Sequence, residues 1–158
     1  MEPPSPAFQP ARLTVADLDE VMELESLAYA QPWTETHFRG EFARPFTLAL
    51  GLKTGQPVSG PPPVLAAQCF FWLLMPEIHL LNLAVRPEYR RRGLGQRLLR
   101  TMLDIGRRAG VETVYLEVRP KNMEAQGLYR SFGFAVTGRR PGYYDDGEAA
   151  HLMTLTLS

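Results

Sequence analysis

The sequence predicts a mixed α/β fold, with helices on both faces of one central β-sheet. Residues 64–74 and 78–85 are two nearly continuous apolar runs joined by a short turn, and such lengths suit neighbouring antiparallel strands. Residues 93–109 instead repeat apolar side chains at helical spacing, opposite a face rich in arginine. The signals run strand, two helices, three strands, helix, strand, helix and two strands, which favours a mixed sheet over an alternating parallel one.

The chain length and its proline-rich start set the expected domain organisation. A chain of 158 residues suits one domain. Residues 1–10 are rich in proline and lack a basic region followed by an apolar stretch, so they predict a short flexible tail rather than a secretory signal. We therefore expect a tail over residues 1–10 and a single domain over residues 11–158.

Two candidate N-caps mark the helices of the N-terminal part. Thr14 is followed by Asp17 at the spacing of a capping box, and apolar residues then recur at helical spacing until Tyr29. Thr34 precedes a second helical segment that carries two phenylalanines four residues apart. The elements predicted here are a strand over residues 11–14, a helix that ends near residue 29, and a helix over residues 35–43.

Glycine and proline divide the rest of the chain. Residues 54–63 are rich in both, and they predict a surface loop because proline lacks the donor that a sheet needs. Gly110 is placed to end the long helix. The remaining predicted elements are strands over residues 47–53, 64–74, 78–85, 113–118, 134–138 and 151–157, and helices over residues 93–109 and 122–132.

The composition argues against several classes of protein. The 17 basic residues balance the 17 acidic ones, so no nucleic-acid partner is expected, and no apolar run reaches the ~18 residues of a membrane span. A cytoplasmic protein is therefore expected. The single cysteine, Cys69, rules out an internal disulfide and a cysteine-rich zinc site, and its apolar surroundings predict an inert core residue. The three histidines are scattered along the chain, and no metal site is expected.

The segment with the most specific chemistry is an arginine- and glycine-rich turn between a strand and a helix. The N-terminus of a helix offers free N–H groups, glycines let a phosphate approach them, and arginines add charged donors. The dinucleotide fingerprint fails at Leu98, where it requires glycine, and the chain contains no P-loop string. A plain solvated basic turn is the alternative to a phosphate site. The turn consists of Arg90, Arg91, Arg92, Gly93, Leu94 and Gly95.

Within this turn, Arg90-x-x-Gly93-x-Gly95 matches the [Q/R]-x-x-G-x-[G/A] acetyl-CoA signature of the GNAT superfamily of N-acetyltransferases. The chain resembles the RimI-type subgroup of that superfamily from about residue 10 to residue 157. Enzymes of this subgroup acetylate the N-terminal amine of proteins, and a ribosomal protein is their name-giving substrate. The chain departs from the pattern in its long proline-rich loop and in having arginine rather than glutamine first in the signature. The further segments that carry the resemblance are Pro32-Trp33 with Phe38, Asn82-Leu83-Ala84-Val85, Leu116-Glu117-Val118-Arg119, Asn122, Leu128-Tyr129, Phe132-Gly133-Phe134, and Arg140 with Tyr143-Tyr144.

The resemblance implies the GNAT fold, acetyl-CoA as co-substrate without a metal, and the N-terminus of a protein or peptide as acceptor. It also implies a monomer or weak dimer, in which the amine attacks the thioester directly without a covalent enzyme intermediate. The oxyanion of that attack would accept a backbone N–H from residues 83–85. For Asn122, a plain helix N-cap is an equal alternative to a coenzyme contact. The residues that the resemblance assigns to acetyl-CoA are Leu83, Ala84, Val85, Arg90, Arg91, Arg92, Gly93, Leu94, Gly95, Asn122 and Tyr129.

Two side chains fall at the family's proton-handling positions: Glu117 at the general base and Tyr129 at the general acid. Glu117 belongs to an otherwise apolar strand, and alternation turns it away from Leu116 and Val118. An edge charge paired with Arg119 is the structural alternative for Glu117. Packing among the apolar residues of its own helix is the alternative for Tyr129.

Three aromatic residues, Trp33, Tyr143 and Tyr144, fall where the family grips its peptide, and rings with polar tips suit a partly wet groove. Ordinary core packing is the alternative for all three. Glu25 and Glu35 lie near this region in sequence and can attract an amino terminus, although exposed helix charges are the simpler interpretation. Two other functions stay open: transfer to a lysine, a polyamine or another small amine, and a catalytically silent coenzyme-A-binding or RNA-associated module.

Overall fold

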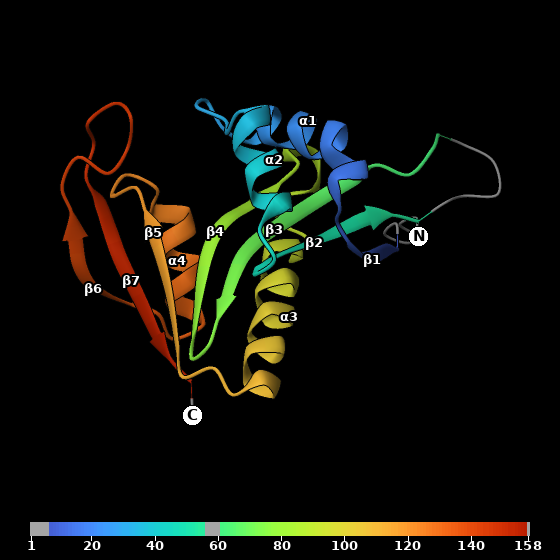
Figure 1. Cartoon of the computed structure of the whole chain (residues 1–158). Coiled ribbons are helices and arrows are strands. Elements are labelled where there is room, and N and C mark those ends of the chain that lie inside the picture. The colour runs from blue at the N-terminus through green and yellow to red at the C-terminus, as the bar shows by residue number, and fades with distance from the viewer. Residues whose placement is uncertain (1–6, 56–60, 158) are drawn as a thin grey trace, which may run out of the picture. The chain divides into compact units, whose positions relative to one another are not determined.

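The structure is a computed structural model that describes residues 7–55 and 61–157 (Figure 1). Within these residues, seven strands form a sheet in the order β1-β2-β3-β4-β5-β7-β6. The strands are β1 (Phe8–Arg12), β2 (Thr47–Thr54), β3 (Leu65–Leu74), β4 (Glu77–Val85), β5 (Thr113–Val118), β6 (Ala135–Arg140) and β7 (Ala150–Thr156). The helices are α1 (Leu18–Ala28), α2 (Glu35–Ala43), α3 (Leu94–Ala109) and α4 (Met123–Ser131), with short 3₁₀ helices η1 (Val15–Asp17) and η2 (Pro87–Tyr89).

The sheet is mixed, as the order of the sequence signals predicts. Strands β4 and β5 run parallel, whereas β1 with β2, β5 with β7, and β6 with β7 are antiparallel. The predicted succession of helices and strands is confirmed, with small shifts in the bounds of each element. None of the helices described is long and apolar enough to cross a lipid bilayer.

Strand β1 corrects the predicted boundary of the N-terminal tail. The strand begins at Phe8, and Pro10 lies opposite Leu52 of β2, so Phe8, Gln9 and Pro10 belong to the sheet. Proline is tolerated here because β1 is the first strand of the sheet, and an edge strand needs ladder bonds on one side only. Residues 1–6 of the predicted tail lie outside the described residues. The loop predicted over residues 54–63 begins one residue later than predicted, because Thr54 still belongs to β2. Residues 56–60 of this loop also lie outside the described residues.

The chain divides into two compact units, neither of which is continuous in sequence. The first unit comprises Met1–Phe70 and Asn82–Thr101, and the second comprises Phe71–Leu81 and Met102–Ser158. The predicted phosphate turn belongs to the first unit, whereas Glu117 and Tyr129 belong to the second. That the whole chain is a single domain stays a prediction.

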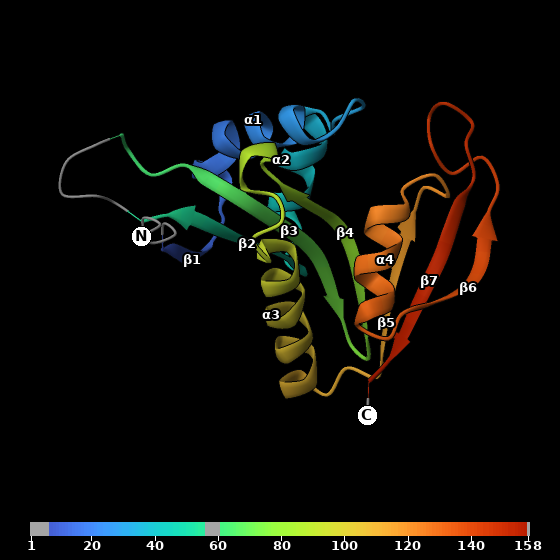
Figure 2. The same cartoon turned by 180° about the vertical axis from the view of Figure 1, so that it is seen from behind.

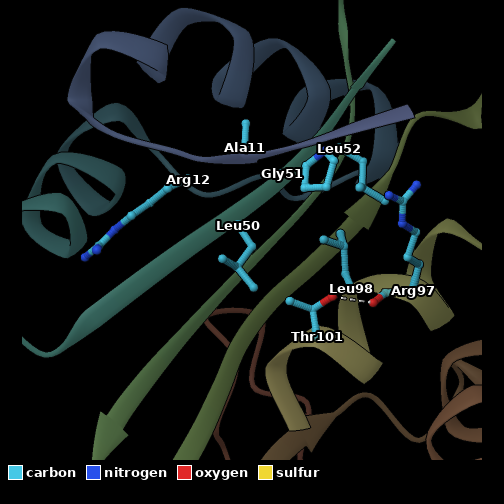
Figure 3. A pocket seen from close by; sticks show the side chains of 9 residues that line it. Ala11, Arg12, Leu50, Gly51, Leu52, Arg97, Leu98 and Thr101 are labelled. Atoms are coloured by element: carbon cyan, nitrogen blue, oxygen red, sulfur yellow. Dashed lines mark hydrogen bonds between the residues drawn. The ribbon is translucent and has the colours of Figure 1, made fainter. Parts of the chain in front are cut away.

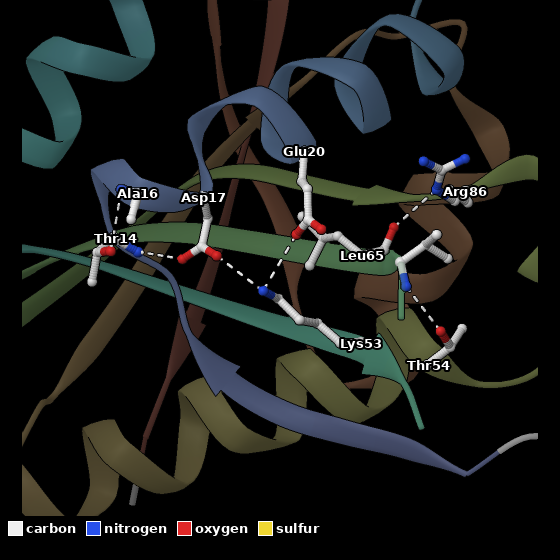
Figure 4. A network of polar contacts seen from close by, with 9 residues as sticks. Thr14, Ala16, Asp17, Glu20, Lys53, Thr54, Leu65 and Arg86 are labelled. Carbon is white, nitrogen blue, oxygen red and sulfur yellow. Dashed lines mark hydrogen bonds and ion pairs between the residues drawn. The ribbon is translucent and has the colours of Figure 1, made fainter. Parts of the chain in front are cut away.

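In the first unit, a polar network around the predicted capping box fixes the start of η1, which continues directly into α1 (Figure 4). The N–H of Thr14 donates to Oδ2 of Asp17 at 2.9 Å, and the N–H of Ala16 donates to Oγ1 of Thr14 at 3.3 Å. Lys53 of β2 joins this box, because its Nζ lies 2.9 Å from Oδ1 of Asp17 and 3.3 Å from Oε2 of Glu20. The cap therefore starts η1, and Lys53 ties this segment to β2. The local sequence signal predicts the cap but not the tie to the strand.

Three further helix ends lie at predicted signals. Oγ1 of Thr34 accepts the N–H of His37 at 3.1 Å and caps α2, while α1 ends at the C-cap Tyr29. Figure 1 shows α1 and α2 next to one another. Gly110 follows α3 with a φ of 89°, the left-handed conformation that a glycine at this position adopts without strain.

In the second unit, alternation along β4 and β5 separates a buried face from a face that carries polar and aromatic groups. Ile78 lies opposite Val114 and Leu80 opposite Leu116, and all four side chains are buried. Residues at the alternate positions of the two strands therefore point to the other face of the sheet, and Glu117 is one of them. Helix α4 lies beside β5 in both views (Figure 2). Strand β6 ends the sheet and carries a register shift between Val136 and Gly138.

Candidate functional site

In the first unit, β4 leads through η2 into the predicted phosphate turn and then into α3. Arg91 and Gly93 both adopt left-handed backbone conformations, with φ values of 65° and 75°. Arg90, Arg91 and Arg92 are exposed, and no acidic residue stands in the first turn of α3. The N-terminus of a sixteen-residue helix therefore faces a turn that offers guanidinium groups, which is the donor set that a phosphate ester needs.

The turn is held in place by Arg86, a buried residue that the sequence reasoning missed. Its Nε donates to the carbonyl of Leu65 at 3.0 Å. Its two terminal nitrogens lie 2.9 Å from Oε1 of Glu23 and 3.3 Å from Oε1 of Glu88. Arg86 thus joins β3, α1 and η2 at the point where β4 ends, and fixes the entry to the turn.

For Glu25, an exposed helix charge is the simpler of the two interpretations that the sequence offers, the other being attraction of an amino terminus. The simpler interpretation is wrong, because Glu25 is only 1% exposed. Its Oε1 accepts a hydrogen bond from Nδ2 of Asn82 at 2.9 Å, and its Oε2 accepts one from the N–H of Trp33 at 3.0 Å. Burial raises the pKa of Glu25 above its ordinary range, while these two hydrogen bonds oppose that rise. By contrast, Glu35 is the exposed helix charge that its simpler interpretation predicts, and it pairs with Arg39 at 3.4 Å.

Trp33 itself lies on an aromatic cluster and is partly exposed. Its ring stacks on His37 with centroids 3.7 Å apart and lies 5.1 Å from the ring of Phe38 and 6.3 Å from that of Phe70. Phe38 and Phe70 are fully buried. One face of the indole is therefore packed, and the predicted role in acceptor binding stays a prediction.

In the second unit, Glu117 lies beside residues of the β6–β7 region rather than at a free edge. Its side chain is 12% exposed, and its Oε1 is 3.1 Å from Nε of Arg140, which is half exposed. Burial raises the pKa of Tyr143 and raises that of Tyr144 to about 12, and the nearby charge of Glu117 contributes to both shifts. The structure thus brings the predicted base and both predicted acceptor-binding tyrosines together.

The ion-pair partner of Glu117 is Arg140 and not Arg119, the partner that the sequence suggests. Arg119 lies 3.0 Å from Oδ2 of Asp146 and 3.6 Å from Oε2 of Glu148. Its guanidinium also sits over the ring of Tyr144, 3.8 Å from the centroid. Arg119 therefore holds the loop that carries the two tyrosines, through contacts that link β5 to the β6–β7 connection.

Of the other predicted site residues, Asn122 and Tyr129 belong to the α4 region, whereas Leu83, Ala84 and Val85 end β4 and Leu94 and Gly95 begin α3. Asn122 is the N-cap, as its structural interpretation predicts, because its Oδ1 accepts the N–H of Ala125 at 3.1 Å. Tyr129 is 8% exposed and packs edge-to-face on Phe134, with ring centroids 5.8 Å apart. The buried Gln126 donates to the carbonyls of Arg119 and Pro120, so α4 is tied to the end of β5. Coenzyme contacts for Asn122 and Tyr129 stay predictions.

Two further expectations concern the single cysteine and a possible metal site. Cys69 is fully buried, which confirms the predicted core position, and burial raises the pKa of its thiol to about 12. Among residues 7–55 and 61–157, no three histidine, cysteine, aspartate or glutamate side chains are grouped in a way that holds a metal ion.

The first unit also contains a small open cavity of about 220 Å³ between β1, β2 and α3 (Figure 3). Arg97 stands at its rim and donates from Nη1 to the carbonyl of Phe8 at 3.1 Å. None of the residues predicted to bind acetyl-CoA or the acceptor lines it. The lining residues are Pro10, Ala11, Arg12, Leu50, Gly51, Leu52, Arg97, Leu98 and Thr101.

Comparison with known proteins adds to this geometry. A profile described as the Acetyltransferase (GNAT) family matches residues 18–134. The [ribosomal protein bS18]-alanine N-acetyltransferase of Escherichia coli (strain K12) is 36% identical over 152 residues, which cover 92% of this chain and 95% of that protein. The N-alpha-acetyltransferase RimI of Mycobacterium tuberculosis is 38% identical over 135 residues, covering 84% of this chain and 81% of the relative. The crystal structure of the ribosomal-protein-S18-alanine N-acetyltransferase from Escherichia coli superposes with a TM-score of 0.83 at 34% identity, over 96% of this chain and 95% of that one.

Proposed function

The chain belongs to the acetyltransferase (GNAT) family, and we propose that it transfers the acetyl group of acetyl-CoA to the N-terminal α-amine of a protein. The observation that carries the proposal is the similarity to bS18-alanine N-acetyltransferases along almost the whole chain, at 34% identity or above. The proposed acceptor is therefore the N-terminus of a ribosomal protein of the bS18 kind.

We assign the pyrophosphate of acetyl-CoA to the turn in the first unit. Three exposed arginines, Arg90, Arg91 and Arg92, supply charge, and the left-handed Gly93 opens the backbone before α3. The first N–H groups of a helix have no partner within that helix, and they favour an anionic group. Backbone groups of residues 83–85 on β4 are assigned to the thioester end, where an N–H stabilises the oxyanion.

The acceptor amine must be neutral before its lone pair attacks the thioester carbonyl. A free α-amine has a pKa of about 7.7–8.0 and a lysine side chain one of about 10.4, so near pH 7 roughly a tenth of the former is neutral and far less of the latter. A modest base is therefore enough for an N-terminus. We assign this role to Glu117, whose Oε1 is engaged by Arg140, so that Oε2 receives the proton from the amine.

Collapse of the tetrahedral intermediate breaks the carbon–sulfur bond and leaves a thiolate on coenzyme A. A thiol has a pKa of about 8.5, so a weak acid is sufficient to protonate it. We assign that proton to the hydroxyl of Tyr129, which lies on α4 in the same unit as Glu117. The products are the acetylated N-terminus and free coenzyme A, with no covalent enzyme intermediate.

The acceptor peptide is assigned to Trp33 in the first unit and to Tyr143 and Tyr144 in the second. The partly exposed indole of Trp33 rests on a buried aromatic cluster, which keeps its orientation fixed. Tyr143 exposes nearly half of its surface, and the ring of Tyr144 is held by Arg119. Such rings offer both apolar area and hydroxyl groups to a peptide backbone.

The test is an acetyl-transfer assay on one peptide that begins with the N-terminal alanine sequence of bS18 and also contains a lysine. The same peptide with a blocked amino end is the control. We expect acetylation of the free N-terminus and none of the blocked peptide, with the modified atom located by mass spectrometry. Transfer to the lysine in both peptides would support the other-amine function instead. Binding of acetyl-CoA without transfer to either peptide would support the silent coenzyme-binding module.

A further inference from the structure

We propose that Glu25 is a positioning residue that fixes the acceptor-binding segment at Trp33 onto strand β4. The inference rests on the proposed function, because that function assigns the acceptor peptide to Trp33. Glu25 does not touch substrate in this scheme. It acts through the two residues that it joins.

Glu25 joins a side chain of β4 to the main chain of the segment that carries Trp33. Each carboxylate oxygen accepts one hydrogen bond: Oε1 from the side-chain amide of Asn82, and Oε2 from the main-chain N–H of Trp33. Both donors are neutral N–H groups, so the carboxylate is matched in geometry but not in charge. Because Glu25 is 1% exposed, this arrangement is built into the interior of the first unit.

The partners of Glu25 lie at or next to residues with an assigned role in the reaction. Asn82 immediately precedes residues 83–85 of β4, which we assign to the thioester end of acetyl-CoA. Its Oδ1 accepts a hydrogen bond from Nε2 of the fully buried Gln68 at 3.4 Å, which holds the amide in place from β3. On the other side, Tyr29 at the end of α1 donates its hydroxyl to the carbonyl of Leu83. Successive residues of β4 are thus tied to the segment that carries Trp33.

Stability alone does not favour a carboxylate at position 25. Glu25 lies in the last turn of α1, where the helix dipole disfavours a negative charge. Burying a carboxylate costs further free energy, and the two donors that the described part of the chain gives Glu25 carry no charge. Only a carboxylate, however, presents two acceptors and no donor to two converging N–H groups. The geometry therefore points to a role in holding Trp33 against β4.

The experiment compares Glu25→Gln with Glu112→Gln, a matched change at an exposed carboxylate between α3 and β5. Glutamine keeps the shape of Glu25 but turns one acceptor into a donor, which one of the two N–H groups must then face. We expect the KM of the acceptor peptide to rise about tenfold in Glu25→Gln, with kcat and the Kd of acetyl-CoA changed by less than about twofold. Glu112→Gln should leave all three values unchanged. An unchanged acceptor KM in a folded Glu25→Gln protein would overturn the proposal.

A second readout does not depend on catalysis. Trp33 and Trp72 are the two tryptophans of the chain, so Trp72→Phe isolates the fluorescence of Trp33. In that background Glu25→Gln should make Trp33 more accessible to acrylamide quenching, whereas Glu112→Gln should not. Should the protein transfer no acetyl group to N-termini, the proposed function fails while the quenching result still tests the clamp. If Glu25→Gln does not fold, Asn82→Ser removes one of the two donors, and an unchanged quenching constant there would overturn the inference.

Discussion

Nε of Arg140 on β6 lies 3.1 Å from Oε1 of Glu117 on β5, although β7 stands between these two strands in the sheet. The guanidinium therefore reaches across β7 to the candidate base. The pair joins a largely buried carboxylate to a half-exposed cation, so a side chain in contact with solvent fixes the orientation of the Glu117 carboxylate. This relationship sets the first two predictions.

Replacing Glu117 with glutamine should lower kcat at least tenfold near pH 7, because the amide keeps the shape but cannot accept the proton of the amine. The Kd of acetyl-CoA should change little, since the assigned phosphate contacts lie in the other unit. Steady-state kinetics across pH, with calorimetry for the coenzyme, make the measurement. A variant with the pH–rate profile of the unchanged protein would remove Glu117 from the role.

Replacing Arg140 with glutamine should lower kcat several-fold while leaving the fold nearly as stable. A half-exposed ion pair contributes about 0–1 kcal/mol to stability, so urea unfolding should detect little change. The loss of rate is expected because Glu117 loses the contact that orients it. The prediction is wrong if unfolding free energy falls by several kcal/mol or if kcat stays the same.

Replacing Tyr129 with phenylalanine should mainly lower the rate constant of transfer, because the ring packing on Phe134 survives and only the hydroxyl is lost. Rapid-mixing kinetics with saturating acetyl-CoA measure that rate. Circular dichroism and thermal melting serve as controls for the fold. Wild-type turnover in this variant would leave Tyr129 with a packing role only.

Replacing Gly93 with alanine should weaken acetyl-CoA binding at the turn. A Cβ at this position meets only Oε1 of Gln96, at 3.8 Å, so alanine causes no steric clash. The cost is backbone strain, because a φ of 75° costs an alanine about 1 kcal/mol and favours a change in the shape of the turn. Gly127 within α4 is the matched control, because an added Cβ there has nothing within 4 Å and the helix favours alanine by about 0.8–1.0 kcal/mol. Gly127→Ala should therefore stabilise the protein, whereas unaltered coenzyme affinity in Gly93→Ala would contradict the assigned turn.

The pH dependence of stability should reveal the buried state of Glu25. Burial raises the pKa of this carboxyl above its ordinary value of 4.5, against hydrogen bonds from Asn82 and Trp33. Its contribution to stability is therefore fully present below pH 4.5 and is lost as pH rises through the raised pKa. Urea unfolding of the protein and of Glu25→Gln should show a difference that favours the native residue increasingly toward acid pH. A difference that does not change with pH would refute the raised pKa.

The parts of the fold that the sequence predicts are those set by neighbours along the chain. The capping box at Thr14 and Asp17 and the glycine stop at Gly110 depend on residues a few positions apart, and the structure confirms them. The start of β1 was missed because proline suggested a tail, and only the position of β1 at the edge of the sheet explains why Pro10 is tolerated there.

The candidate site is less readable because its contacts join distant segments. The pairing of Glu117 with Arg140 depends on the strand order β5-β7-β6, which no local pattern shows. The burial of Glu25 does have a local signal: Leu18, Val21 and Glu25 follow one another at spacings of three and four, so the buried stripe of α1 includes the carboxylate. A charged residue on an apolar helical face is therefore a better indicator of a buried polar clamp than of solvent exposure.

The irregular edge strand β6 has a consequence for encounters between copies of the protein. Its register shift between Val136 and Gly138 interrupts the regular row of backbone groups, and its last two residues, Arg139 and Arg140, are charged. Both features make a strand a poor template for another chain to extend. The outermost ribbon of this sheet is thus protected against intermolecular β-pairing, the route by which exposed sheets polymerise into aggregates.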